Sequence, residues 1–106
     1  METKSALAAL AALAQQSRLA IFRALVAAGP AGLAAGKIAE LTAIAPSSLS
    51  FHLKELVYAD LAGWRQDGRF VIYQANFTTM LGLVGFLTDN CCGGEPCGAV
   101  GNPPRP

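Results

Sequence analysis

The sequence predicts one mainly helical domain that carries a single β-hairpin, which is an α+β fold. Apolar residues recur with helical spacing through most of the first 58 positions, and again after residue 76. Between these segments, strand-forming residues flank Asp67 and Gly68, a pair that favours a two-residue type I′ hairpin turn. The chain has 106 residues, 53% of them hydrophobic and 14% charged, so it is long enough for one core and too apolar for disorder over most of its length.

The N-terminal segment does not predict export. Its Ala-rich run, residues 6–14, loosely resembles a secretory signal, but Glu2 accompanies Lys4 and the leucines recur every third residue, like one face of a helix. Apolar runs elsewhere fall well short of the ~20 residues of a membrane-spanning helix. The formal net charge of +1 comes with no strongly basic tail. We therefore expect a cytoplasmic protein with no membrane partner.

Residues 3–14 form the first predicted helix, which is rich in the strong helix formers Ala and Leu. Leu7, Leu10 and Leu13 make one apolar stripe along it. A helix this short gains most of its stability from packing. The stripe therefore needs a partner, either within the subunit or on a second subunit.

Two further helices are expected before residue 46. The second begins after Ser17 and ends at Gly29, which is followed by a proline. The third and weaker helix covers Leu33–Thr42, and we expect its Ile38 and Leu41 to point inward. A brief connector leads from it to the next helix.

The fourth predicted helix begins near Pro46, because proline suits the first helical turn, where its missing N–H donor is not needed. At about 100° per residue, one side of this helix is apolar and faces the core. A partner surface would explain why its opposite side shows a mixture of polar and aromatic residues to water, so we take that side as a candidate contact surface. The apolar side comprises Leu49, Leu53, Leu56 and Val57, and the opposite side comprises Ser47, Ser48, Phe51, Lys54 and Tyr58.

The last two predicted elements are the hairpin and a final helix. The hairpin covers Leu61–Ala75 and places Arg65 and Arg69 near its tip. The final helix, Phe77–Leu87, is apolar almost all round, and its two interior glycines each cost about 1 kcal/mol relative to alanine. Burial on both sides at a subunit interface explains such a helix most simply. We therefore expect a homodimer held by the first and last helices.

All three cysteines lie in the C-terminal segment. We divide the chain into residues 1–88, a folded domain, and residues 89–106, a flexible tail that holds Cys91, Cys92 and Cys97. In a reducing compartment, thiols are more often metal ligands or sensors than structural disulfides. The tail is therefore the candidate sensing segment.

The predicted order of elements is that of a winged helix-turn-helix, in which the second helix of the motif enters the DNA major groove and a hairpin forms the wing. On this order and on three sequence segments, the chain resembles the ArsR family of metalloid- and metal-responsive repressors. The resemblance extends over residues 5–88. It is carried by residues 13–19 (LAQQSRL), 50–56 (SFHLKEL) and 65–69 (RQDGR), followed by Val71 and Tyr73.

This resemblance implies a dimer that binds double-stranded operator DNA. Serine hydroxyls near the helix start are suited to phosphates or base edges, Lys54 to a phosphate and Phe51 to a thymine methyl group, while His52 matches a position that the family associates with the recognition helix. The alternative is that the serines only compete for backbone bonds and that exposed hairpin arginines contact nothing specific. Two recognition helices would read an inverted repeat with half-sites about 34–36 Å apart. The expected DNA contacts are Ser47, Ser48, Ser50, Phe51, His52, Lys54, Arg65 and Arg69.

The expected inducer is As(III) or Sb(III), bound by the thiolates of Cys91, Cys92 and Cys97, whereas DNA binding itself needs no cofactor. Soft thiolates select soft acceptors, and three sulfurs fit ions that bind trigonally with a lone pair. No fourth Cys or nearby His completes a tetrahedral zinc site. The arrangement resembles family members whose arsenite site follows the final helix. The thiols that the best-known members carry before the recognition helix are absent here, because the matching positions are Ala34, Gly36 and Ala39.

Other interpretations of the cysteines stay open. The main competitor is Cd(II), Pb(II) or Zn(II) with a water or Glu95 as an additional ligand, and a thiol redox sensor on the same scaffold is another. Cys92 could form a disulfide with Cys97, or all three cysteines could be unimportant tail residues. A thiol metal carrier or small thiol enzyme that does not bind DNA is the remaining alternative. The single histidine and the lack of a close carboxylate pair or Gly-rich phosphate loop argue against catalysis, so we expect no enzyme.

Overall fold

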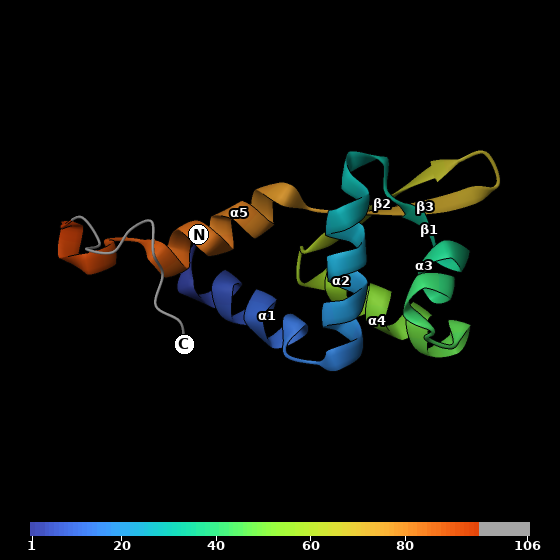
Figure 1. Ribbon diagram of the computed structural model, residues 1–106, viewed down its shortest axis with the longest axis horizontal. Helices are drawn as coiled ribbons and strands as arrows, with labels where there is room; N and C mark the ends of the chain where they lie inside the picture. The colour runs from blue at the N-terminus through green and yellow to red at the C-terminus, as the bar shows by residue number, and fades with distance from the viewer. Residues whose placement is uncertain (96–106) are drawn as a thin grey trace.

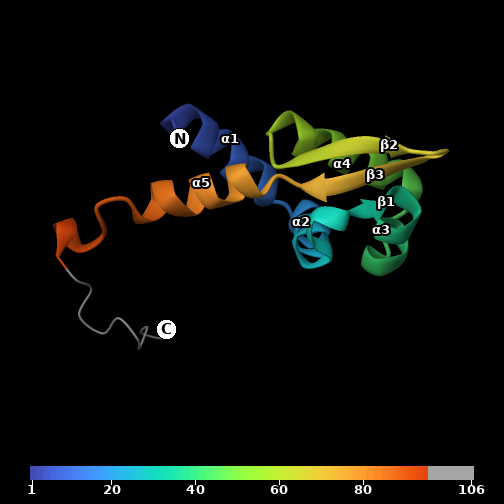
Figure 2. The same cartoon turned by 90° about the horizontal axis from the view of Figure 1, so that it is seen from above.

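The computed structural model describes residues 1–95 and shows a helical domain with a small antiparallel sheet. In chain order the elements are α1 (Thr3–Leu13), α2 (Gln16–Ala28), the 3₁₀ turn η1 (Gly29–Ala31), β1 (Leu33–Ala34), α3 (Ala35–Thr42), α4 (Pro46–Tyr58), β2 (Ala62–Asp67), β3 (Phe70–Ala75), α5 (Phe77–Thr88) and the 3₁₀ turn η2 (Cys91–Gly94). Figures 1 and 2 show α2, α3 and α4 grouped beside the sheet, whereas α1 and α5 lie side by side at the other end of the molecule. This arrangement confirms the predicted mainly helical fold with a hairpin.

The hydrophobic core lies between α2, α3, α4 and the sheet. Ile21 and Leu25 of α2 are fully buried, as is Ile38 of α3, and α4 adds Leu53 and Leu56 from its predicted apolar side. Full burial of each such aliphatic side chain contributes about 1.5–3 kcal/mol. This core fixes the orientation of α4, and therefore decides which of its side chains face solvent.

Alanines form the inward face of α1, and not leucines. Ala6, Ala9 and Ala12 are buried, whereas Leu7 is 61% and Leu10 38% exposed. Small side chains let the backbone of α1 lie close to its neighbours, which turns these larger side chains outward. Within residues 1–95, the two exposed leucines of the predicted stripe are therefore only partly covered.

The third predicted helix begins later than expected. Leu33 and Ala34 form β1 instead, pairing antiparallel with Tyr73 and Ile72 of β3, and α3 starts at Ala35. The sheet has the order β1-β3-β2, so the strand farthest along the chain lies in the middle. The backbone pairing with β3 decides the conformation of this segment, because it satisfies donors and acceptors that a weak helix start would leave open.

The prediction that Leu41 points inward is wrong, since this side chain is 56% exposed. The buried and half-buried positions of α3 are residues 35, 38, 39 and 42. At 3.6 residues per turn, their centre lies about 110° from Leu41 around the helix. Ile38 is buried as expected.

Gly32 is required where η1 enters β1. Its φ is +72° and its ψ −172°, a region that is accessible almost only to glycine. A Cβ at this position would also collide with the carbonyl oxygen of Tyr73 and with Cγ2 of Ile72. The contact between η1 and the sheet is therefore possible only without a side chain.

We expect Gly32→Ala to lower the free energy of unfolding by about 3 kcal/mol, because it combines backbone strain with overpacking. Urea unfolding followed by circular dichroism measures the loss. Gly63→Ala in β2 is the matched control, since its added Cβ meets no atom within 4 Å. Equal losses in the two variants would contradict the assignment.

The hairpin is present, but its turn is shifted by one residue from the predicted one. Asp67 pairs with Phe70, so the two loop residues are Gly68 and Arg69. Gly68 has a φ of +64°, whereas Arg69 is not among the described residues with positive φ. A glycine with positive φ at the first loop position is typical of a type II′ turn, so the predicted type I′ turn centred on Asp67 and Gly68 is wrong.

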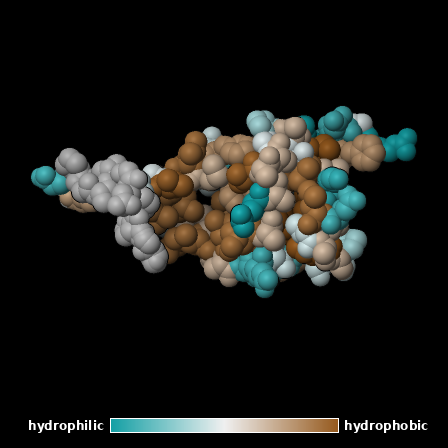
Figure 3. Space-filling view, viewed as in Figure 1, coloured by the Kyte–Doolittle hydropathy of each residue, from teal (hydrophilic) through white to brown (hydrophobic). Residues whose placement is uncertain are grey.

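The final helix, α5, is apolar but only partly covered. Leu83 is buried, whereas Leu81, Val84 and Leu87 are all more than half exposed. Figure 3 shows an apolar surface over the part of the molecule where α1 and α5 lie. Within the described chain, burial on both sides of α5 is therefore not achieved.

No single helix within residues 1–95 is long and apolar enough to cross a membrane. Only α1 and the segment Gln16–Ala31 pass such a test together, on length and composition, and they are bent by 103° where they meet.

Candidate DNA-binding surface and cysteine segment

The polar side of α4 is exposed as predicted. Leu49 and Leu53 are buried against the core, which leaves the opposite side of the helix facing solvent. Phe51 is 56% exposed and adds an aromatic ring to this otherwise polar side. The exposed positions along this side are Ser47, Ser48, Ser50, Phe51, Lys54 and Tyr58.

The N-terminus of α4 faces solvent with its backbone donors available. Ala45 is the N-cap residue and has no side-chain oxygen to cap the helix, and Pro46 occupies the first turn. The following serines, Ser47 and Ser48, are exposed. Uncapped N–H groups and serine hydroxyls at a helix start suit an anion such as a phosphate.

His52 lies apart from this exposed side, in a half-buried position. Its Nδ1 is 3.4 Å from Nη1 of Arg18, which donates if Nδ1 carries no proton, and its ring meets Phe51 edge-on with centroids 5.5 Å apart. Arg18 also donates from Nε to the carbonyl oxygen of Ala12 at 2.7 Å, while its backbone N–H donates to Oε1 of Gln15. The structure thus places His52 in a contact between helices.

Arg18 joins the end of α1, the start of α2 and the middle of α4 through these bonds. The sequence indicated Arg18 only as part of the segment 13–19. Its partners are 6 and 34 residues away in sequence, so no local pattern could have indicated them. Arg18 is a positioning residue for α4.

We expect Arg18→Met to lower the free energy of unfolding by about 2 kcal/mol, because hydrogen bonds from a charged donor contribute about 1.5–3 kcal/mol each and part of that is lost to solvent exposure. Arg23→Met is the matched control, since Arg23 lies on the same helix and is exposed. Urea unfolding of both variants measures the difference. If Arg23→Met is equally destabilising, the contacts of Arg18 contribute nothing specific.

The two hairpin arginines differ in their surroundings. Arg65 donates to Oε1 of Gln74 and, from Nη1 and Nη2, to the carbonyl oxygens of Pro30 and Ala31 at 3.5 and 2.8 Å. Its guanidinium therefore ties the sheet to η1 and does not extend toward the tip. Arg69 lies in the turn itself, is exposed, and within residues 1–95 forms no side-chain hydrogen bond or ion pair.

A shallow groove of about 230 Å³ separates α4 from the wing. Its lining combines Ser50, Lys54 and Val57 of α4 with Trp64 of β2 and Tyr73 of β3. Trp64 and Tyr73 face each other in the strand register. The exposed side of α4 therefore continues across the groove onto one face of the hairpin, an extension that the sequence analysis missed.

The C-terminal end of α4 is tied to the start of α5 by Asp60. The N–H of Asp60 donates to the Val57 carbonyl at 3.0 Å, and that of Leu61 to the Leu56 carbonyl at 2.9 Å, the bonds of a Schellman motif. Asp60 has a φ of +65°, where glycine is usual. Its carboxylate accepts from Nδ2 of Asn76 at 3.2 Å and from Oγ1 of Thr79 at 3.1 Å.

The cysteine segment follows α5 directly. Cys91 and Cys92 lie in η2, and their Sγ atoms are 3.7 Å apart. Cys92 has a φ of +57°, and Gly93 next to it one of +64°. Cys97, the third predicted ligand, lies outside the described residues. Among residues 1–95, no three His, Cys, Asp or Glu side chains gather closely enough to hold a metal ion.

Comparison with known proteins finds a domain family that matches the central part of the chain. Residues 13–62 match the family described as a helix-turn-helix domain, a range that includes α2, α3 and α4. No curated protein matches the chain.

Several solved structures share the fold. An ArsR-like transcriptional regulator from Rhodococcus sp. RHA1 has a TM-score of 0.74 at 21% identity, covering 85% of this chain and 82% of that one. HlyU from Vibrio cholerae has a TM-score of 0.67 at 26% identity, covering 87% and 99%. The homodimeric winged helix-turn-helix DNA-binding domain of a possible ArsR-family regulator from Mycobacterium bovis has a TM-score of 0.65 at 25% identity, covering 89% and 87%.

These findings agree with the geometry of α3, α4 and the hairpin. The chain therefore contains a helix-turn-helix domain within a winged helix-turn-helix fold.

Proposed function

We propose that the protein is a homodimeric repressor that binds operator DNA and releases it when As(III) or Sb(III) binds to Cys91, Cys92 and Cys97. The observation that carries the DNA-binding part is the exposed side of α4. There, hydroxyl groups, a cation and the 56% exposed ring of Phe51 lie together, next to the uncapped helix start. No acidic side chain stands among these exposed positions.

In this proposal α4 enters the major groove and the tip of the wing contacts the DNA backbone or the minor groove. Ser47, Ser48, Ser50, Phe51 and Lys54 supply the contacts from α4. Arg69 supplies the contact from the turn. His52 and Arg65, which were also expected to contact DNA, act mainly through the contacts that hold α4 and the wing in position.

A homodimer is supported by the apolar side chains that α1 and α5 leave exposed. Leu7, Leu81, Val84 and Leu87 are each more than half exposed, and α1 and α5 are neighbours. A net charge of +1 per chain gives little nonspecific affinity for DNA. A second copy of the protein contacts to DNA, supplied by dimerisation, would raise this affinity. The domain from Mycobacterium bovis is described as homodimeric. Two copies of α4 would then read an inverted repeat.

The sensing part of the proposal rests on the position of the cysteines. Cys91 and Cys92 follow α5 after only two residues, and their Sγ atoms are 3.7 Å apart. An ion that orders this segment would act on the proposed interface helix. Allosteric coupling of this kind typically changes affinity by about 1–3 kcal/mol.

The test is binding of the full chain to a labelled duplex of its own promoter, measured by fluorescence anisotropy. We expect binding without metal, and release on adding arsenite or antimonite. Release by Cd(II), Pb(II) or Zn(II) alone would replace the inducer, while release by peroxide that a reductant reverses would favour the redox alternative. A chain that ignores duplex DNA under all these conditions would contradict the repressor proposal.

A further inference from the structure

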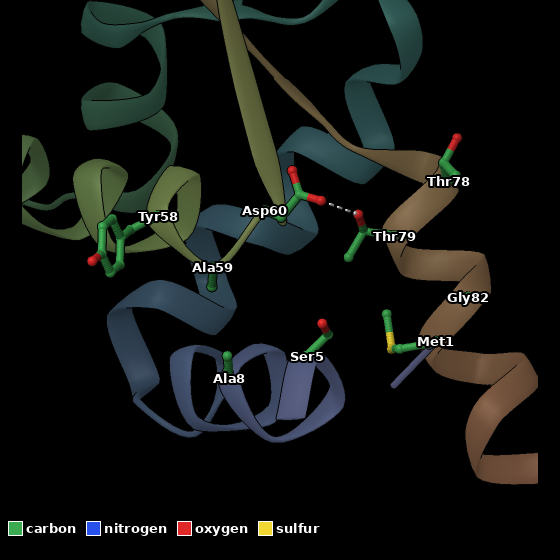
Figure 4. Close-up of a pocket in the computed structure, with 9 residues that line it drawn as sticks. All are labelled: Met1, Ser5, Ala8, Tyr58, Ala59, Asp60, Thr78, Thr79 and Gly82. Atoms are coloured by element: carbon green, nitrogen blue, oxygen red, sulfur yellow. Dashed lines mark hydrogen bonds between the residues drawn. The ribbon is translucent and has the colours of Figure 1, made fainter. Parts of the chain in front are cut away.

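A pocket of about 430 Å³ opens between α1, the C-terminal end of α4 and α5. Figure 4 shows the side chains of Ser5, Thr79 and Met1 around this space, with Asp60 above it and Gly82 on the far helix. A volume of this size lies in the range of roughly 300–1,000 Å³ that small-molecule sites occupy. Neither the wing nor the exposed side of α4 that carries Phe51 contributes to it, apart from Tyr58 at the helix end.

The lining of this pocket combines apolar walls with one polar end. Met1, Ala8 and Ala59 provide apolar surface, and Gly82 leaves the wall of α5 open. Asp60 supplies the only charged side chain among the lining residues, and the N-terminal ammonium group of Met1, the other charged group there, forms no ion pair with it. Such a lining suits a compact apolar body that carries a single positive group.

Asp60 has acceptor capacity left for such a group. Its carboxylate already accepts one hydrogen bond on each oxygen, from Asn76 and from Thr79. A carboxylate offers about four lone-pair sites, so it can accept from a further donor. Among residues 1–95, Asp60 forms no ion pair. Its negative charge is therefore uncompensated by a side chain.

The pocket lies away from the apolar side chains that the proposed dimer would cover. On α5 it is lined by residues 78, 79 and 82, whereas the exposed apolar positions are 81, 84 and 87. At 3.6 residues per turn, the centres of these two sets are about 165° apart around the helix. On α1, the lining positions 5 and 8 are about 160° from the exposed Leu7 and Leu10. A dimer formed through the exposed leucines would leave the pocket open.

We propose that this pocket binds a small organic ammonium compound, with its charged group at the Asp60 carboxylate and its apolar body between α1 and α5. The site is separate from the cysteines. Asp60 ties the end of α4 to Asn76, the N-cap residue of α5, and to Thr79 in its first turn. A cation that binds this carboxylate therefore acts on the link between the two helices. The effect on DNA affinity rests on the proposed repressor function, but binding of the ligand does not.

The test compares phenethylammonium with its neutral analogue 2-phenylethanol, using the full isotope-labelled chain and amide chemical shifts. We expect the shifts to cluster around the pocket. The cation should bind about fivefold more tightly than the neutral alcohol, because an exposed ion pair rarely strengthens binding by more than this factor. Asp60→Asn should remove the preference and keep the fold, since asparagine tolerates positive φ. Gly82→Leu should fill the pocket and weaken both compounds. Asp67→Asn in β2 is the matched control and should keep the preference.

Three results would overturn the proposal: equal binding of the two compounds, an unchanged preference in Asp60→Asn, or no shifts at the pocket. If Gly82→Leu does not fold, Asp60→Asn still decides. Promoter binding is measured in parallel. A chain that binds promoter DNA and responds to arsenite, yet ignores phenethylammonium, contradicts this proposal alone. One that binds phenethylammonium but no DNA contradicts the proposed function alone.

Discussion

Replacing Cys91 with serine is expected to abolish the release of promoter DNA by arsenite while leaving DNA binding itself unchanged. In the intact chain, a coupling of about 1–3 kcal/mol corresponds to an arsenite-induced loss of affinity of roughly 5–150-fold. A serine hydroxyl is a hard ligand that stays protonated at neutral pH, so it does not replace a thiolate toward a soft ion. Anisotropy titrations of labelled promoter DNA, with and without arsenite, measure the effect.

The same substitution at Cys92 and at Cys97 completes the experiment. All three variants should bind the promoter as tightly as the intact chain when arsenite is absent, because Cys91 and Cys92 lie beyond α5, Cys97 follows them in sequence, and none of the three belongs to α4 or the wing. Binding stoichiometry of arsenite per chain should fall with each substitution. Undiminished release in all three variants would remove the cysteines from the mechanism.

Leu81→Glu is expected to weaken dimerisation by at least about 100-fold and to reduce operator affinity with it. Leu81 is 63% exposed on α5 and belongs to the apolar side chains that we assign to the interface. An unpaired carboxylate in a desolvated contact costs several kcal/mol, and about 2.7 kcal/mol already corresponds to a factor of 100. Sedimentation analysis over a range of concentrations gives the monomer–dimer equilibrium.

Leu41→Glu is the matched control, because Leu41 is a similarly exposed leucine, at 56%, on α3 instead of α5. It should dimerise and bind DNA as the unmodified chain does. A monomeric Leu81→Glu variant that keeps full operator affinity would show that dimerisation is not needed for DNA binding. An unmodified chain that is monomeric at all concentrations would contradict the assigned interface.

Local patterns predicted most of the architecture. The apolar spacing of α4, with Leu49, Leu53 and Leu56 buried, depends only on helical geometry and the hydrophobic effect, and it fixed the exposed side at the same time. The hairpin was also predictable from its strand-forming residues, although the turn lies one residue later than Asp67 and Gly68 indicate.

Contacts between distant residues account for what the sequence analysis missed. Leu33 is a strand residue because it pairs with Tyr73, 40 positions later in sequence. The position of His52 depends on Arg18, and that of Arg65 on the carbonyl of Ala31, partners 34 residues away in both cases. Periodicity and propensity report on neighbours in sequence, so they carry no information about such pairs.

The choice between two possible inward faces of α1 was also beyond local reasoning. Both a leucine stripe and an alanine stripe run along this helix, and transfer energies favour burying leucine. The structure buries Ala6, Ala9 and Ala12 instead, on the face of α1 that contacts α2, α4 and α5. Transfer energies of single side chains do not report how closely two helices approach each other.

The anchoring of Arg65 has a consequence for how the molecule would meet a double helix. Since its guanidinium holds the sheet to Pro30 and Ala31, the hairpin travels with the helical body as one unit. An operator whose two halves are rotated or shifted from their best separation could not be accommodated by a wing that bends independently. Any such mismatch would have to be accommodated at the interface between the two protomers. The rigidity of that interface would therefore decide how much variation in operator length the dimer tolerates.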